Sequence, residues 1–369
     1  MQSRFQRVRG GHGPPSYFLF KHHMKKAASK LFICGLGSTA TVICLYIFSG
    51  MLTHSKNGFI RLFPSHFIVD SNRLDIGYNS YYIAGITDTH IYLGNYTATN
   101  QVMQVNYALN DIHRIILSVP SGRRFAWKAM KVFVDSTGIY MMEGISPIIL
   151  HVDFHNRVES EYRSFKPFNE SIPISPGSFI MNRFDAPLNQ DILVKLRMDT
   201  TNHQMANYIL SKQMDGIFSV DGMINWDPDN KKIVYLYFYR NEFICLDTNL
   251  TPIYTGHTID TIRHAHIKLT PPSPERTITF ASPPLMTNQR CCVSGNWLYI
   301  QSALMANNEK PEYFKTNSVI DLYSIQNGRY RFSFYLPDLF HSKARDFCVR
   351  GNRLFALYGH YLVSFKMYP

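Results

Sequence analysis

Charged residues are scarce in this chain, and the short motifs that mark several large enzyme classes are absent from it. Asp, Glu, Lys and Arg make up 17% of the 369 residues, whereas 45% are hydrophobic. That balance excludes a disordered chain, because such chains are rich in charge and poor in apolar residues. The sequence contains no G-x-S-x-G elbow, no P-loop and no G-x-G-x-x-G stretch. It therefore lacks the signatures of α/β-hydrolases, P-loop nucleotide enzymes and dinucleotide-binding dehydrogenases.

Acidic residues are missing from the first 30 residues, which carry seven basic ones. The segment 31–52 that follows has no charged residue over about 22 positions, a length that crosses a bilayer. The positive-inside rule then predicts a basic cytoplasmic tail (1–30), a transmembrane signal anchor in contact with the lipid bilayer (31–52) and a far-side tether (53–65). A cleaved signal peptide is the alternative, but its apolar region usually spans only about 7–15 residues. Since the basic excess belongs to the tail, we expect no nucleic-acid partner.

The sequence has six cysteines but no C-x-x-C pair of the kind that binds zinc. Cys34 and Cys44 fall within the apolar segment, where cysteine behaves as a small apolar residue. The others would face an oxidising compartment in the predicted topology. We therefore expect one disulfide, from Cys291 or Cys292 to Cys348, with free buried thiols as the alternative.

From residue 66 onward, short apolar runs alternate with Gly, Asn, Asp and Pro, a texture typical of β-strands joined by turns. Two stretches near the C-terminus share the pattern of a strand, a Gly-Asn turn and a second strand, and four weaker copies precede them. The copies begin near Tyr82, Val132, Phe179, Phe218, Cys291 and Phe347. Their spacing, about 40–70 residues, is close to the length of a propeller blade once insertions are allowed.

We predict an all-β fold, a six-bladed β-propeller over residues 66–369 that follows one N-terminal transmembrane helix. Seven blades and a pair of stacked β-sandwiches are the alternatives, although sandwiches need no repeat of this length. The last copy is short, so a strand within residues 67–76 is expected to complete the final blade and close the ring. The Pro-rich link at 256–290 fits this scheme least well and is either a large loop or a degenerate blade.

Besides the repeat, the C-terminal third contains stretches that resemble those of a known protein family. The resemblance is carried by TIDTI at 258–262, PPL at 283–285, SVIDLY at 318–323, FSFY at 332–335, RDF at 345–347 and LFAL at 354–357. These stretches resemble uncharacterised, membrane-anchored six-bladed β-propeller proteins of Gram-negative bacteria. The resemblance implies a periplasmic propeller on an inner-membrane anchor. It implies no activity, because that group has no assigned catalytic residues.

Candidate site residues follow from the propeller prediction. The innermost strand of each blade faces the central channel, and propeller hydrolases bring acidic residues there from several blades. Asp135, Asp221 and Asp346 stand early in the repeated units and are the candidate catalytic carboxylates, with calcium as the ion such a set would bind. His264 and His266 are candidate metal ligands, because H-x-H on a strand places two imidazoles on one face. The plainer alternatives are turn positions for the carboxylates and a solvated loop for the histidines.

The stretch from Asp227 to Asp229 has the D-x-D spelling of a metal and nucleotide site. Such a site needs a buried strand before it, whereas here the following Asn and Lys residues are those of a hairpin loop. We therefore predict a turn at this position.

Because no catalytic signature is present, the sequence favours a non-enzymatic binding or scaffold module for a protein, peptide or other cell-envelope ligand. The anchor would hold it in the inner membrane, with the N-terminus in the cytoplasm and the propeller in the periplasm. A propeller hydrolase or lyase that uses the channel carboxylates, with or without calcium, is the alternative. A lesser alternative is an accessory protein of a membrane redox system. No cofactor other than calcium is expected.

Overall fold

The computed structural model describes residues 29–45, 57–119, 125–163, 166–198, 204–206, 209–271, 278–339 and 341–368. The chain divides into two compact units, Met1–Lys56 and Asn57–Pro369. In the first unit, residues 29–45 are helical. Across the described part of the chain, no helix combines the length and the apolar character needed to cross a membrane. Positions 46–52 of the predicted anchor lie outside the described residues.

The second unit is built mainly from antiparallel β-strands, with a short helix, α2 (Pro311–Thr316), and a 3-10 turn, η1 (Trp127–Ala129). Its largest sheet has eight strands in the order β5-β4-β3-β2-β6-β7-β8-β9. These are β2 (Tyr81–Ile86), β3 (His90–Asn95), β4 (Gln101–Asn106), β5 (Ile112–Ile116), β6 (Lys131–Asp135), β7 (Gly138–Glu143), β8 (Ile148–Val152) and β9 (Val158–Arg163). The two halves meet where β2 and β6 run parallel through one bridge, between Gly85 and Val134. Only glycine fits there, because a Cβ atom would lie 1.8 Å from the Val134 carbonyl oxygen.

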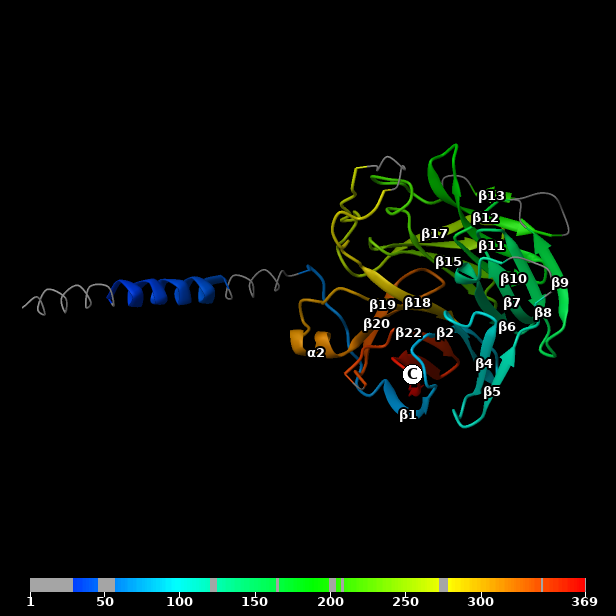
Figure 1. The fold of residues 1–369 in the computed structure, drawn as a ribbon, viewed down its shortest axis with the longest axis horizontal. Helices are drawn as coiled ribbons and strands as arrows, with labels where there is room; N and C mark the ends of the chain where they lie inside the picture. The colour runs from blue at the N-terminus through cyan, green and yellow to red at the C-terminus, as the bar shows by residue number, and fades with distance from the viewer. Residues whose placement is uncertain are drawn as a thin grey trace, which may run out of the picture. The chain divides into compact units, whose positions relative to one another are not determined.

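Three four-stranded sheets follow, and in each of them strands that are neighbours in sequence pair antiparallel. The first contains β10 (Glu170–Ser175), β11 (Ser178–Asp185), β12 (Gln190–Arg197) and β13 (Gln204–Ala206). The second contains β14 (Gly222–Asp227), β15 (Lys232–Tyr237), β16 (Glu242–Asp247) and β17 (Pro252–His257). The third contains β18 (Asn288–Ser294), β19 (Trp297–Ser302), β20 (Ser318–Ser324) and β21 (Tyr330–Leu336). The sheets are set around a common centre (Figure 1).

The last sheet joins the two ends of the second unit. It contains β22 (Asp346–Arg350), β23 (Arg353–Tyr358), β24 (Tyr361–Met367) and, beside β24, the first strand β1 (Ile68–Asp75). The β1–β24 pairing runs from Ile68 opposite Met367 to Asp75 opposite Tyr361. This confirms the prediction that a strand within 67–76 completes the last sheet. Because β1 covers the edge that β24 would otherwise expose, the sheets close into a β-propeller.

In five of its six copies, the sequence repeat marks the first hairpin of a four-stranded sheet or of one half of the eight-stranded sheet. The copy that begins near Phe179 is the exception, because it covers β11 and β12 and therefore the second hairpin of its sheet. The first hairpin there is harder to recognise, since β10 contains Pro173 and turns through Pro176 and Gly177 without a Gly-Asn pair.

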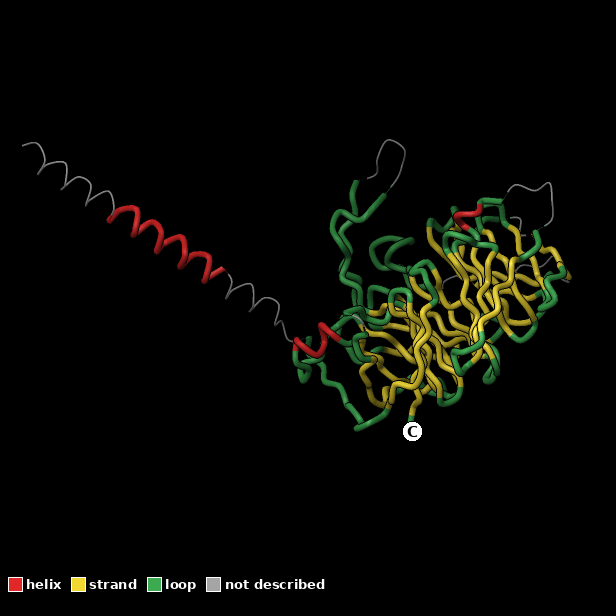
Figure 2. Tube along the Cα trace, turned by 60° about the horizontal axis from the view of Figure 1, so that its bottom comes forward, coloured by secondary structure: helices red, strands yellow, loops and turns green. Residues whose placement is uncertain are grey.

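The Pro-rich link at 256–290 forms no additional sheet in its described part. Strand β17 ends at His257, β18 begins at Asn288, and the segment between them holds one isolated bridge, between Leu269 and Phe280. Figure 2 shows it as a loop that stands away from the strands. Of the two interpretations of this link, the structure supports the large loop.

Apolar side chains fill the spaces between neighbouring sheets. Phe347 and Val349 of β22 pack with Tyr299 of the preceding sheet. Cys348, which lies between them on the strand, packs instead with Tyr81 of the following sheet. Side chains alternate along a strand, so each innermost strand contacts the sheets on both sides.

Residues 57–65 differ from the predicted tether. They lie against the sheet β18–β21, where the Asn57 side chain donates a hydrogen bond to the Met305 carbonyl oxygen at 2.8 Å. Arg61 is 2% exposed and pairs with Asp321 of β20. Polar groups of this segment therefore form hydrogen bonds to the propeller, and the second unit begins at Asn57.

Candidate functional site

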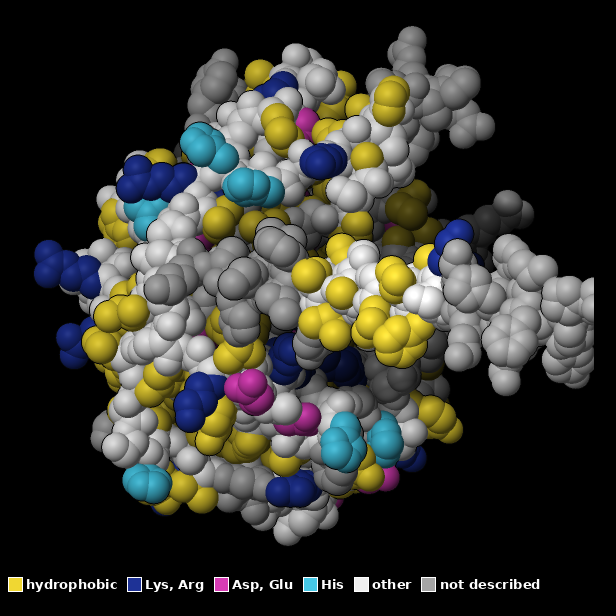
Figure 3. Space-filling view, turned by 90° about the vertical axis from the view of Figure 1, so that its left-hand side faces the viewer, with side chains coloured by type: hydrophobic (Ala, Val, Ile, Leu, Met, Phe, Trp, Pro, Cys, Tyr) yellow, Lys and Arg dark blue, Asp and Glu magenta, His cyan; other side chains and the backbone are white. Residues whose placement is uncertain are grey.

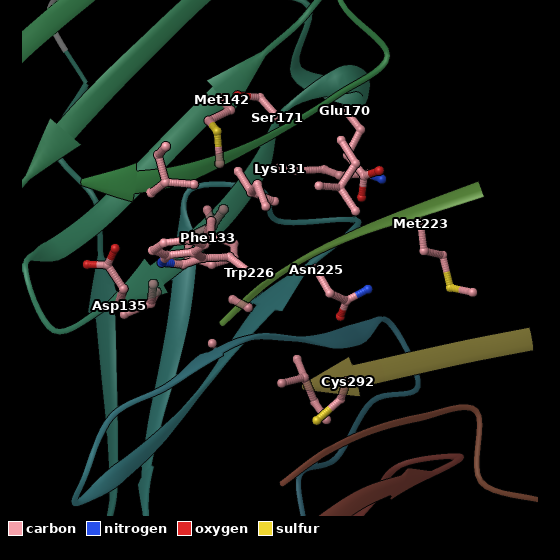
Figure 4. Close-up of a pocket in the computed structure, with 18 of the residues that line it drawn as sticks. Lys131, Phe133, Asp135, Met142, Glu170, Ser171, Met223, Asn225, Trp226 and Cys292 are labelled. Atoms are coloured by element: carbon pink, nitrogen blue, oxygen red, sulfur yellow. The ribbon is translucent and has the colours of Figure 1, made fainter. Parts of the chain in front are cut away.

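A central cavity of about 1530 Å³ lies in the second unit, and residues from β2, β6, β10, β14, β18 and β22 line it. Figure 4 shows Glu170 and Lys131 near one another on its wall, with Met223, Asn225 and Cys292 on other parts of the lining. Pockets for small ligands usually measure about 300–1,000 Å³. This cavity can therefore hold a larger ligand, such as a peptide segment.

The three predicted carboxylates, Asp135, Asp221 and Asp346, all line this cavity. Asp135 stabilises the β6–β7 turn, since its Oδ1 accepts hydrogen bonds from the Thr137 N–H at 2.7 Å and the Thr137 hydroxyl at 2.6 Å. Asp346 accepts one from the Ile83 N–H of β2 at 3.0 Å. The structure does not gather the three: in the part of the chain that it describes, no group of three or more His, Cys, Asp or Glu residues is arranged to hold a metal ion. Their catalytic role stays a prediction.

The free edges of the innermost strands present N–H groups that need acceptors. At four junctions a side chain of the neighbouring innermost strand supplies the acceptor. The pairs are Val132 N–H with the Tyr82 hydroxyl at 2.7 Å, Ile83 N–H with Asp346 at 3.0 Å, Ile224 N–H with Glu170, and Val349 N–H with the Cys292 sulfur. Several polar residues of the channel wall therefore hold neighbouring sheets together.

Three carboxyl groups gather at the junction of β10, β12 and β14. Burial raises the pKa of Glu170 to about 7, against the opposing effect of the Lys131 ammonium group. Burial, and then the charge of Asp221, raise the pKa of Asp191 to about 6. Burial also raises the pKa of Asp221 to about 6, against a hydrogen bond from the Gly222 N–H. The Tyr235 hydroxyl interacts with all three carboxyl groups, which places it among them.

Sequence reasoning found Asp221 but missed Glu170 and Asp191. Glu170 is the first residue of an innermost strand and was detectable only if the start of β10 had been recognised. Asp191 belongs to the third strand of its sheet, and no local pattern indicates that it reaches the same place.

The predicted metal ligands His264 and His266 are exposed, and the buried Ala265 separates them. Figure 3 shows a face on which histidines are interspersed with basic and hydrophobic side chains. No described His, Cys, Asp or Glu residue completes a metal-binding group with them. At the D-x-D stretch, Asp227 accepts hydrogen bonds from the N–H groups of Asp229 at 3.1 Å and Asn230 at 3.3 Å, which confirms the predicted turn.

The six cysteines are all free, so the predicted bridge from Cys291 or Cys292 to Cys348 is not formed. Cys291 and Cys292 are adjacent on β18 and face opposite sides: Cys291 packs toward β14 and β15, and Cys292 packs toward β22. Cys348 points to the other side of β22, into the cluster around Tyr81. Cys292 and Cys348 therefore lie on opposite sides of strand β22. Their sulfur atoms cannot bond without movement of the backbone.

No family model matches the chain, and no curated protein matches its sequence. Among solved structures, it is similar to a member of the DUF4221 family from Bacteroides vulgatus, with a TM-score of 0.50 and 12% identity over 82% of this chain and 97% of that one. A catalytically inactive virginiamycin B lyase from Staphylococcus aureus with quinupristin gives a TM-score of 0.46 and 12% identity, over 80% of this chain and 99% of that one. The β-propeller domain of Swd1 from Myceliophteria thermophila gives a TM-score of 0.42 and 8% identity, over 82% of this chain and 100% of that one. At these identities the likeness concerns the fold alone.

Proposed function

We propose that this protein is a membrane-anchored binding module, a six-bladed β-propeller that recognises a protein, peptide or other cell-envelope ligand through its central channel. The observation that carries the proposal is the cavity of about 1530 Å³ lined by all six innermost strands. The eight-stranded sheet counts as two blades, because its halves meet through a single bridge. Much of the polar lining serves the fold, as Asp135 does in its turn, and this favours binding over catalysis.

The proposed location is the inner membrane, with residues 31–52 as the anchor and the propeller in the periplasm. The seven basic residues before that segment and the absence of charge within it support this orientation. Fusions at the C-terminus test it. Alkaline phosphatase, which folds only outside the cytoplasm, should be active there, whereas a fusion of green fluorescent protein exported by the same route should be dark. The reverse pattern would contradict the proposal.

Channel binding is tested by peptide selection against the full chain and two tryptophan variants. Met223→Trp fills the cavity, which Met223 lines on β14. Ile253→Trp is the matched control, since Ile253 is 50% exposed on the outer strand β17. Peptides that bind the wild type and the control but not Met223→Trp support the channel as the site. Equal binding to all three proteins would place recognition elsewhere.

A propeller hydrolase or lyase is the second candidate, and the carboxyl groups of Glu170 and Asp221 favour it. With pKa values of about 7 and 6, they exchange protons near neutral pH, as a general acid or base must. A panel of lactones and glycosides, assayed with and without calcium, tests this function. If both Asp221→Asn and Asp346→Asn abolish turnover, the enzymatic function is supported. If turnover is unchanged in both variants, these carboxylates are not catalytic residues.

A further inference from the structure

We infer that the part of the channel wall formed by Glu170, Asp221 and Asn182, with Asp191 close behind Asp221, binds an organic cation that carries N–H donors, an ammonium or guanidinium group. The inference rests on the proposed binding function and names the chemistry of its ligand. A lysine or arginine side chain of a peptide, or a free polyamine, presents such a group.

The first argument is the lack of a cationic partner for the carboxylates. Glu170, Asp191 and Asp221 form no salt bridge with any residue that the structure describes, whereas Asp321, for example, is paired with Arg61. Lys131 is the nearby cation, and it acts on the Glu170 carboxylate through space. Asp191 is buried, and Glu170 and Asp221 are half-buried. A carboxylate removed from water without a cation beside it is unfavourable, so a cation that enters between these groups gains a strong interaction.

The second argument is independent of charge and concerns Asn182. This side chain is 3% exposed, lies opposite Glu170 in the β10–β11 pair and lines the cavity. Its Nδ2 donates to the Tyr235 hydroxyl at 3.4 Å, and that hydroxyl donates to the Val220 carbonyl oxygen at 2.6 Å. No described donor reaches the Asn182 Oδ1 atom. An unsatisfied buried acceptor beside carboxylates calls for a ligand with N–H groups.

Two aromatic residues line the same cavity, Phe168 and Phe238. Phe168 precedes Glu170 by two residues, and the Phe238 N–H donates to the Asp221 carbonyl oxygen at 3.1 Å. Ring faces attract organic cations and pack against the carbon chain that carries them.

A metal ion fits this site less well than an organic cation. The carboxylates belong to no group of three or more His, Cys, Asp or Glu residues, among those described, that could hold a metal. A calcium ion needs its oxygen ligands at about 2.3–2.6 Å, whereas an ammonium or guanidinium group reaches outward through N–H bonds to acceptors that stand farther apart.

The charged groups around the site determine how its affinity for a cation depends on pH. Lys131 of β6, Tyr235 of β15 and Cys291 of β18 act on the carboxyl groups from neighbouring strands, and Asp215 acts on Asp191. Since cation binding requires ionised carboxylates, affinity should rise with pH through about 6–7, and binding in that range should release protons.

Calorimetric titration of the full chain in detergent micelles tests the inference at about pH 8, where the carboxyl groups are ionised. The probes are a lysine tripeptide, the same peptide with its side-chain amines acetylated, spermidine and calcium. We expect the charged tripeptide to bind and the acetylated one not to bind. Asp221→Asn should weaken binding by about tenfold or more. The matched control Asp229→Asn, at an exposed position elsewhere on the wall, should change it less than about twofold.

The two sources of the cation give different results, since a peptide site binds the tripeptide more tightly and a polyamine site prefers spermidine. If Asp221→Asn fails to fold, Glu170→Gln replaces it, because its carbonyl oxygen can still accept from the Ile224 N–H. Calcium binding without cation binding, or equal binding of the acetylated peptide, overturns the inference. The peptide selection described above separates this inference from the proposed function. If it yields channel-dependent peptides without Lys or Arg, the inference is overturned and the proposed function stands. If it yields no channel-dependent peptide, the proposed function itself is wrong.

Discussion

The guanidinium group of Arg61 forms a two-point ion pair with the carboxylate of Asp321, with Nε–Oδ1 at 2.7 Å and Nη2–Oδ2 at 3.0 Å. Arg61 also pairs with Glu309 and donates to the Leu304 carbonyl oxygen at 2.9 Å. The three charged side chains are buried. Since Arg61 precedes the first strand and Asp321 lies on β20, the pair joins the N-terminal segment to a sheet near the other end of the chain.

Replacement of Arg61 should destabilise the propeller strongly. Arg61→Met leaves two buried carboxylates without their cation, and such a loss typically lowers the free energy of unfolding by about 3–5 kcal/mol. Arg350→Met is the matched control, because Arg350 pairs with the exposed Asp88 and an exposed pair contributes about 1 kcal/mol or less. Urea unfolding of both variants measures the difference, and similar losses in the two would contradict the structural role of Arg61.

The closing strand can be tested by its register. Leu74 lies directly opposite Leu362 in the β1–β24 pair. The double variant Leu74→Cys with Leu362→Cys should therefore form a disulfide on oxidation, and its oxidised form should be more stable than its reduced form by about 2–4 kcal/mol. The pair Leu74→Cys with Val363→Cys should not, because a shift of one residue turns the side chain to the other face. Mass spectrometry of the oxidised proteins checks both, and equal cross-linking would contradict the pairing.

The raised pKa values predict how stability depends on pH. Between about pH 4 and 7 the folded state keeps protons on Glu170, Asp191 and Asp221 that the unfolded state has lost, so the free energy of unfolding should fall as pH rises through this window. Asp221→Asn should be more stable than the wild type by about 2–3 kcal/mol near pH 7.5 and similar to it near pH 4. Thermal unfolding across this range measures it, with Asp229→Asn as the exposed control. A constant difference between wild type and Asp221→Asn at all pH values would count against the assignment.

The thiols should be free but unreactive in the native protein. Burial raises the pKa of Cys291, Cys292 and Cys348, so little thiolate is present to react. A thiol reagent should modify these residues slowly in the native state and all six cysteines after denaturation. Reductant should leave the melting temperature unchanged. A count of four thiols and a melting temperature lowered by reductant would show a disulfide.

Much of the fold could be predicted because its signals are local. The Gly-Asn turns at 295–296 and 351–352 mark tight hairpins, and Gly295 adopts the positive φ of +60° that such a turn requires. The short last copy of the repeat indicated a missing strand, which β1 supplies. The predicted disulfide was not formed, because cysteine spacing does not reveal which face of β22 each sulfur occupies.

The sequence by itself determined the strand-rich composition, the repeated hairpins and the segment that closes the ring, since alternation and turn residues act over a few neighbouring positions. It also placed Asp221 on the channel wall. Only the tertiary structure decided that Glu170 and Asp191 join Asp221, and that Arg61 is buried against Asp321. The physical reason is that these contacts join strands distant in sequence, and the packing between sheets, which no local pattern encodes, brings them together.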